Sequence, residues 1–138
     1  MVQAYLPSAE NEYTCSILYG ENRLPLNVLA MRRLKLKGIT LSAVYDNSCH
    51  AVEDFLMELA PKLCGRYSLN AQLRVENGDP YIFEINPRFS SSEPLRRLVG
   101  HDSYLQLLSQ YYNVNGDTPS KRYGTTLRAY SEVFLPNM

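Results

Sequence analysis

The feature that most constrains the fold is an alternation of apolar and polar residues between positions 69 and 86. From residue 69 to residue 76, the odd positions are apolar and the even positions are polar. After the turn-forming residues 77–79, the apolar odd positions and the polar residues Glu84 and Asn86 continue the pattern. This alternation predicts a β-hairpin with one face packed on a core and one polar face.

The two faces of the hairpin also predict its register. If apolar residues face apolar residues across the ladder, Ala71 lies near Ile85 and Gln72 lies near Glu84. This register needs an odd-numbered loop such as residues 77–79, because a two-residue Asn-Gly turn would place Gln72 opposite Phe83. We therefore expect a three-residue loop.

The segments on either side of the hairpin predict the rest of the fold. Strand-favouring residues predict an antiparallel meander of three strands, over 12–19, 24–36 and 39–45. Apolar residues at helical spacing predict a helix over 49–63, with Asp46-Asn47-Ser48 at its start and Gly65 as its C′ residue. The elements expected after the hairpin are a helix capped by Ser91 or Ser92 and ended by Gly100, a helix from Asp102 to Tyr112, and a strand from Tyr123 to Phe134.

We expect these elements to form a single α+β domain over residues 1–138, an antiparallel β-sheet with helices packed on one face. The chain carries 14 Lys and Arg against 14 Asp and Glu, so it lacks the basic excess of a nucleic-acid-binding protein. No apolar run reaches the roughly 20 residues of a membrane span, and the first five residues show no signal peptide. The three cysteines and two histidines fit neither a disulfide framework nor a zinc site. We expect a cytoplasmic protein with no nucleic-acid partner and no membrane association.

The polar face of the hairpin offers oxygen ligands. Gln72, Glu84 and Asn86 would project from this face, and Arg88 follows just beyond the second strand. Such carboxylate and amide oxygens suit Mg²⁺ with open positions for phosphate oxygens. A guanidinium beside them could bind a phosphate or an acyl phosphate. The alternative is that these residues are only solvated, on the outer face of a half-exposed sheet.

Two strings in the hairpin resemble a known family. Asn70-Ala71-Gln72 and Pro80-Tyr81-Ile82-Phe83-Glu84-Ile85-Asn86-Pro87-Arg88-Phe89-Ser90 resemble the metal-binding hairpin of the ATP-grasp superfamily, in particular its carbamoyl-phosphate synthase large-subunit-like branch. The resemblance implies an ATP-grasp C-terminal subdomain. It implies that Gln72, Glu84 and Asn86 bind the Mg²⁺ (or Mn²⁺) ions that bridge the phosphates of ATP. It also implies that Arg88 is catalytic, as a contact to the transferred phosphoryl group or the acyl phosphate.

The resemblance extends to the start of the chain. Residues 2–7 are similar to the family's hinge strand, which implies that the carbonyl of Gln3 and the N–H of Leu6 or Tyr5 meet the adenine of ATP. Tyr5 and Leu6 would also fit an ordinary core strand. Glu12 resembles the acidic residue of the family that accepts hydrogen bonds from the ribose hydroxyls. The alternative interpretation is that Glu12 is an exposed residue at the start of a strand.

The sequence leaves the roles of three arginines open. The resemblance implies that Arg32 or Arg33 lies near phosphates or an acidic substrate, and the alternative is a solvated basic face. Arg128 could meet a substrate carboxylate or be a surface charge. The chain departs from the family in length and in lacking a Gly-rich phosphate loop, and Ser91–Pro94 stands where family members often have glycines.

The resemblance implies an ATP-dependent carboxylate–amine or carboxylate–thiol ligase that forms an acyl phosphate. We expect this chain to be its C-terminal portion, with ATP and an unidentified carboxylate as ligands and the missing N-terminal half as a partner. We expect the chain alone to bind Mg-nucleotide weakly and not to turn over.

A second hypothesis is a non-catalytic module, derived from an ATP-grasp fold, that binds a partner protein. Its eleven tyrosines, including the pair Tyr111-Tyr112, would suit such an interface. We also expect self-association, because a subdomain without its other half exposes sheet edge and apolar surface.

Overall fold

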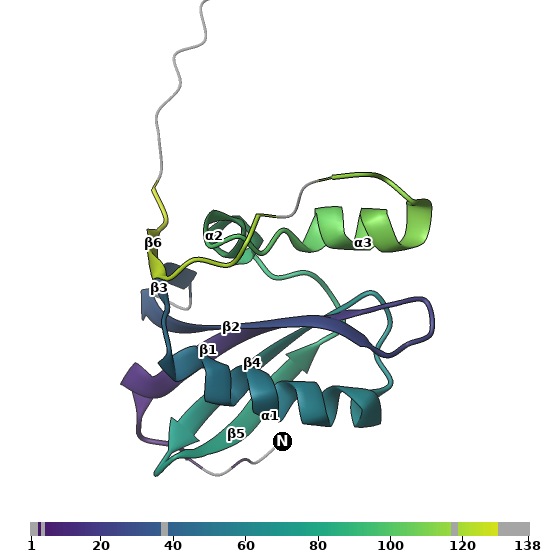
Figure 1. The fold of residues 1–138 in the computed structure, drawn as a ribbon. Helices are drawn as coiled ribbons and strands as arrows, with labels where there is room; N and C mark the ends of the chain where they lie inside the picture. Colours follow the sequence, from purple (N-terminus) through teal and green to yellow (C-terminus); the bar gives the residue numbers. More distant parts are fainter. Residues whose placement is uncertain (1–2, 4, 37–38, 117–118, 130–138) are drawn as a thin grey trace, which may run out of the picture.

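A computed structural model of the chain describes residues 3, 5–36, 39–116 and 119–129 (Figure 1). Six antiparallel strands form one sheet in the order β5-β4-β1-β2-β3-β6. The strands are β1 (Glu12–Tyr19), β2 (Pro25–Leu36), β3 (Ile39–Tyr45), β4 (Ser68–Glu76), β5 (Asp79–Asn86) and β6 (Gly124–Leu127). The helices are α1 (Ser48–Leu63), α2 (Glu93–Leu98) and α3 (Ser103–Tyr112), and a short 3₁₀ turn spans Ala9–Asn11.

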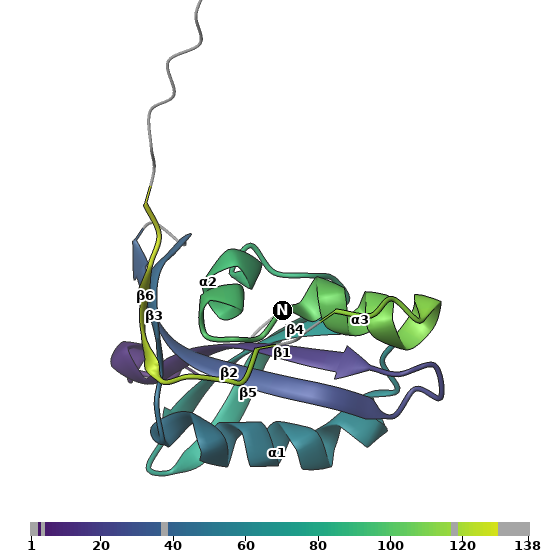
Figure 2. The ribbon, with the colours of Figure 1, turned by 45° about the horizontal axis from the view of Figure 1, so that its top comes forward.

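The helices cover both faces of the sheet, with α1 on one side and α2 and α3 on the other (Figures 1 and 2). On the α1 side, the Tyr19 hydroxyl donates to the Ala60 carbonyl at 3.1 Å. On the opposite side, the Ser16 and Ser103 hydroxyl oxygens lie 3.5 Å apart. The α+β class and the antiparallel sheet are confirmed, but the helices are not confined to one face as we predicted. All eight residues of β1 are therefore buried.

The meander β1–β2–β3 is confirmed, and the hairpin β4–β5 has the predicted register at residues 70–72 of β4, whereas residues 73–76, next to the turn, are shifted by one. Ala71 pairs with Ile85 and Gln72 pairs with Glu84, as expected. The loop, however, is the two-residue turn Asn77-Gly78, whose φ angles of 54° and 94° suit a type I′ hairpin. A register shift after Gln72 leaves Phe83 as the extra residue of a β-bulge. The bulge restores the register that the short turn would otherwise have shifted.

The helix ends differ from expectation at two positions. After α1 the left-handed residue is Cys64, with φ 47°, and not Gly65. Gly65 is needed for space, because an added Cβ would lie 2.3 Å from the Tyr19 ring. Ser92 does not cap α2 with its side chain, since its hydroxyl donates to Thr40 Oγ1 at 3.4 Å. Asp102 does cap α3, accepting from the Leu105 N–H at 3.0 Å.

The two ends of the chain are less regular than predicted. Gln3 and residues 5–8 form no strand, and Val2 and Ala4 lie outside the described residues. The predicted last strand over 123–134 is limited to β6, and its residues from 130 onward are also outside the described part. In the described part of the chain, no helix combines the length and apolar character that a membrane crossing requires. The three cysteines are free thiols.

Candidate functional site

The hairpin brings the predicted ligand residues to one face at the β5 edge of the sheet. Gln72 lies opposite Glu84, and Asn86 follows two residues later on β5. Gln72 also pairs with Thr14 of β1, which places this face on the α2 and α3 side of the sheet. Glu84 is exposed, whereas Gln72 and Asn86 are half-buried, and Asn86 Nδ2 donates to Glu84 Oε1. The three oxygen-bearing side chains thus share one face that is open at Glu84.

A buried carboxylate organises the polar face beside these residues. Glu12 is fully buried and lies between Arg33 of β2 and Arg74 of β4. Arg33 donates from Nε and Nη2 to Glu12 Oε1, and Arg74 donates from Nε and Nη2 to Oε2. The alternative that Glu12 is an exposed strand-start residue is therefore wrong. These four hydrogen bonds occupy the four lone-pair positions of a carboxylate, so a ribose hydroxyl would have to displace an arginine donor.

Arg33 is one of the residues whose role the sequence left undecided. Its side chain is 7% exposed, so the alternative interpretation, a solvated basic face, is wrong for this residue. Besides Glu12, its Nη2 donates to Gln72 Oε1, which places a cation directly beside the predicted ligands. Arg32 lies on the other face, where it pairs with Asp46 at 3.5 Å and is 39% exposed. Of the two arginines, the geometry therefore puts only Arg33 at the candidate site.

The donor set fits magnesium in its chemistry. Mg²⁺ prefers oxygen ligands and is usually held by one or two carboxylates together with phosphate oxygens and waters. Glu84 supplies the carboxylate, and Gln72 and Asn86 supply amide oxygens, although Gln72 Oε1 accepts from Arg33 in this structure. No cluster of three or more His, Cys, Asp or Glu suited to a metal occurs among the described residues. The hairpin face groups one carboxylate and two amide side chains, whose oxygens are ligands of the kind that Mg²⁺ prefers.

Arg88 and Arg128 each donate a hydrogen bond to a backbone carbonyl of the segment that links β5 to α2. Arg88 is exposed, and its Nη1 donates to the Phe89 carbonyl at 3.0 Å. Arg128 follows β6 and donates from Nη2 to the Ser91 carbonyl at 2.6 Å, while its Nε is buried without a partner in the described structure. The segment between β5 and α2 thus contains Arg88 and also accepts a hydrogen bond from Arg128. No local sequence pattern indicates this contact of Arg128.

The N-terminal segment lies beside the hairpin. Gln3 is exposed, and its side-chain Nε2 donates to the Phe83 carbonyl at 3.0 Å. The Leu6 carbonyl accepts from Arg74 Nη1. Tyr5 is 85% exposed, so the alternative of a core strand is wrong for this residue. The structure thus brings Gln3 and Leu6 to β5 and β4, at the end where Glu12 begins β1.

A second buried network was missed at the sequence level. Arg96 of α2 is fully buried and donates from Nη2 to Thr14 Oγ1 at 3.0 Å and to Asn70 Oδ1 at 2.8 Å. Its Nη1 donates to Glu93 Oε1. Because Asn70 lies opposite Asn86 across the ladder, this network anchors α2 directly to the hairpin that carries the candidate ligands.

Comparison with solved structures identifies the fold. One neighbour is the ADP complex of N5-carboxyaminoimidazole ribonucleotide synthetase, with TM-score 0.64 and 14% identity over 86% of this chain and 33% of that one. The chain has an ATP-grasp fold. N5-carboxyaminoimidazole synthase from Aspergillus clavatus, in complex with ADP and 5-aminoimidazole ribonucleotide, gives TM-score 0.63 and 11% identity over 86% and 34% of the two chains.

A third ATP-grasp neighbour comes from another kind of enzyme. It is the biotin carboxylase domain of 2-oxoglutarate carboxylase from Hydrogenobacter thermophilus, in complex with MgADP, ADP and bicarbonate. It gives TM-score 0.55 and 12% identity, over 84% of this chain and 29% of that one. Neither a protein-family model nor a curated protein sequence matches this chain significantly. The chain spans about a third of the length of the ATP-grasp enzymes that it resembles.

Proposed function

We propose that this chain is the C-terminal, ATP- and magnesium-binding portion of an ATP-grasp carboxylate ligase. The observation that carries the proposal is the hairpin register, which sets Gln72 opposite Glu84 and leaves Asn86 on the same face. The likeness to enzymes solved with ADP, and in one case with MgADP, supports it. The Asn70-Ala71-Gln72 and Glu84–Arg88 strings favour the carbamoyl-phosphate synthase-like branch.

Gln72, Glu84 and Asn86 would hold Mg²⁺, or Mn²⁺, which when bound offsets the negative charge of the nucleotide phosphates. The chain's own cations act beside them. Arg33 is held in place by Glu12 and presents its guanidinium next to Gln72, where it can bind a phosphate oxygen. Arg88 is free to turn from the Phe89 carbonyl toward the transferred phosphoryl group or the acyl phosphate.

The N-terminal segment would bind the nucleoside. The backbone of Gln3, Tyr5 and Leu6 meets the adenine in this proposal, and Glu12 meets the ribose after an arginine donor has been displaced. The whole ligase would transfer the γ-phosphoryl group to a carboxylate, whose acyl phosphate is then attacked by an amine or a thiol. That reaction requires the N-terminal half that we propose as partner. We therefore expect the 138-residue chain alone to form no acyl phosphate.

Calorimetric titration of the chain with ADP, with and without Mg²⁺, tests the proposal. We expect weak binding that depends on Mg²⁺, and a loss of affinity on the order of tenfold in the double variant Glu84→Gln/Asn86→Ala, because a charged ligand and an amide ligand are removed together. The matched control Glu58→Gln/Asn115→Ala changes two exposed residues elsewhere and should bind as the wild type does.

An unchanged affinity in Glu84→Gln/Asn86→Ala would refute the metal site. The non-catalytic partner-binding module would then be the better interpretation. Its supporting observation is an apolar cavity of about 360 Å³ beside α3, lined by residues that include the exposed Tyr104 and Tyr112. Tyrosines of this kind are enriched in protein interfaces.

Self-association through the sheet edge is a separate expectation. β5 is an outer strand, and its Tyr81 and Ile85 are 47% and 39% exposed. Light scattering at concentrations on the order of tens of micromolar should detect dimers or larger species, because exposed apolar edges pair with one another. Ile85→Lys should return the chain to a monomer, whereas Leu24→Lys, in an exposed turn, should not. A monomeric wild-type chain would contradict this expectation.

A further inference from the structure

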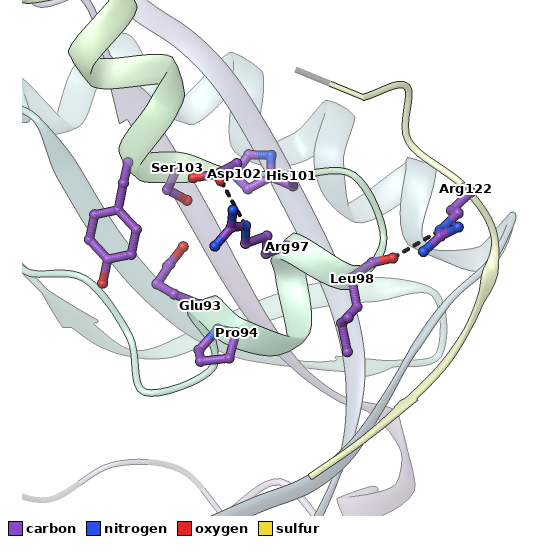
Figure 3. Close-up of a pocket in the computed structure, with 9 residues that line it drawn as sticks. Glu93, Pro94, Arg97, Leu98, His101, Asp102, Ser103 and Arg122 are labelled. Carbon is purple, nitrogen blue, oxygen red and sulfur yellow. Dashed lines mark hydrogen bonds and ion pairs between the residues drawn. The ribbon is translucent and has the colours of Figure 1, made fainter. Parts of the chain in front are cut away.

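A cavity of about 530 Å³ opens between α2 and the start of α3 (Figure 3). Its volume falls in the range of roughly 300–1,000 Å³ that is usual for small-molecule sites. None of its lining residues belongs to the hairpin β4–β5, so the cavity is distinct from the candidate magnesium site. Two acidic and two basic side chains line it, which makes its lining formally neutral.

The cavity contains a buried carboxylate oxygen without a partner. Glu93 is 4% exposed, and only its Oε1 is used, as the acceptor for Arg96. Its Oε2 has no hydrogen-bond partner among the described residues. In Figure 3, Glu93 points from α2 across the cavity toward Ser103. A buried carboxylate oxygen is costly to leave unpaired, so this atom is suited to accept from a ligand donor.

A guanidinium lies beside this acceptor. Arg97, one helical turn after Glu93, pairs through Nε with Asp102 Oδ2 at 3.0 Å, and its side chain is 75% exposed. Among the described residues, the contact of its guanidinium is this one through Nε, which leaves Nη1 and Nη2 to a ligand. In Figure 3 these terminal nitrogens point toward the space between Glu93 and Ser103. The cavity therefore presents an anionic acceptor and a cationic donor to the same space.

His101 adds two ring nitrogens to the cavity wall without adding a charge. The residue is fully buried, and neither ring nitrogen has a partner among the described residues. Burial, together with the nearby positive charges of Arg96 and Lys121, lowers the pKa of the imidazole to about 3, so the ring is neutral at physiological pH. Pro94, Leu98 and Tyr104 form the apolar part of the wall.

We propose that this cavity binds a free α-amino acid with an apolar side chain. The ammonium group donates to Glu93 Oε2, and the carboxylate accepts from Arg97 in the bidentate geometry that guanidinium groups favour. The side chain of the ligand lies against Pro94, Leu98 and Tyr104. A zwitterion matches the formally neutral lining, whereas an amine alone leaves Arg97 unused and a carboxylic acid alone meets the charge of Glu93.

Isothermal titration and ¹⁵N chemical-shift mapping of the 138-residue chain test the proposal with L-leucine and L-phenylalanine as probes. We expect at least one probe to bind, with shifts confined to α2, α3 and the residues between them. 2-Phenylethylamine and 3-phenylpropionate, which each lack one charged group, should bind at least about tenfold more weakly than L-phenylalanine. Titrations without nucleotide or Mg²⁺ keep the outcome independent of the proposed ligase function.

Arg97→Met removes the carboxylate contact at an exposed position and should weaken amino-acid binding by about fivefold or more. Arg66→Met, at an exposed site outside the cavity, should leave binding unchanged. Glu93→Gln should also weaken binding, and its amide spectrum reports whether the variant is folded. Absence of binding by both probes, equal binding by Arg97→Met, or shifts away from α2 and α3 would each overturn the proposal.

Discussion

Replacement of Arg96 by methionine is expected to lower the free energy of unfolding by about 3–5 kcal/mol. Arg96 is fully buried, and its guanidinium satisfies Glu93, Thr14 and Asn70 together. The variant leaves the Glu93 carboxylate buried without its counter-charge, which is the costly way to break a buried ion pair. Urea denaturation followed by circular dichroism measures the change.

The neighbouring residue provides the matched control. Arg97→Met removes an arginine whose side chain is 75% exposed, and its ion pair with Asp102 should contribute no more than about 1 kcal/mol. The double variant Glu93→Leu/Arg96→Met removes both charges and should recover much of the stability that Arg96→Met loses. A loss below about 1 kcal/mol in Arg96→Met would show that this ion pair does not hold α2 on the sheet.

Glu12→Gln is expected to destabilise the chain by about 3 kcal/mol or more. Glu12 is the carboxylate that the side chains of Arg33 and Arg74 share, and those side chains are only 7% and 20% exposed. A neutral amide leaves two positive charges close together, without the anion that offsets their repulsion. Chemical denaturation of the variant measures the difference.

Glu10→Gln is the control for this substitution, because Glu10 lies two residues earlier and is exposed. It should change stability by no more than about 0.5 kcal/mol. The candidate site depends on Glu12 to hold Arg33 beside Gln72, so Glu12→Gln should also weaken MgADP binding. Equal stability of the Glu10 and Glu12 variants would contradict the assignment of Glu12 as the centre of this cluster.

The pairing of Gln72 with Glu84 could be predicted because one face of the hairpin is apolar and the other is polar. The type of turn could not be predicted. An apolar core and a polar face require even positions to face even positions, and with a short loop this requirement pairs Gln72 with Glu84. A two-residue turn combined with a bulge at Phe83 gives the same pairing of Gln72 with Glu84 as a three-residue loop would. Nothing in the local sequence distinguishes them, since the bulged residue is an ordinary phenylalanine and not a glycine.

The clusters around Glu12 and Arg96 could not be predicted for a different reason. Each joins residues of separate elements, and the cluster of Glu12 exists only because β1 lies between β2 and β4. Charged side chains are rarely buried, so a sequence alone favours solvent exposure for Glu12, Arg33 and Arg96. The prediction of helices on one face also missed that the small polar residues of β1 pack under α2 and α3.

The most direct test of the central claim is paramagnetic broadening by MnADP in the amide spectrum of the ¹⁵N-labelled chain. Mn²⁺ replaces Mg²⁺ at oxygen sites and broadens the signals of nearby nuclei. The proposed site predicts the strongest broadening at Gln72, Glu84 and Asn86, with weaker broadening in α1 on the opposite face, and loss of the effect in Glu84→Gln/Asn86→Ala. Broadening that is absent from the hairpin, or that persists in the double variant, would contradict a metal–nucleotide site on β4 and β5.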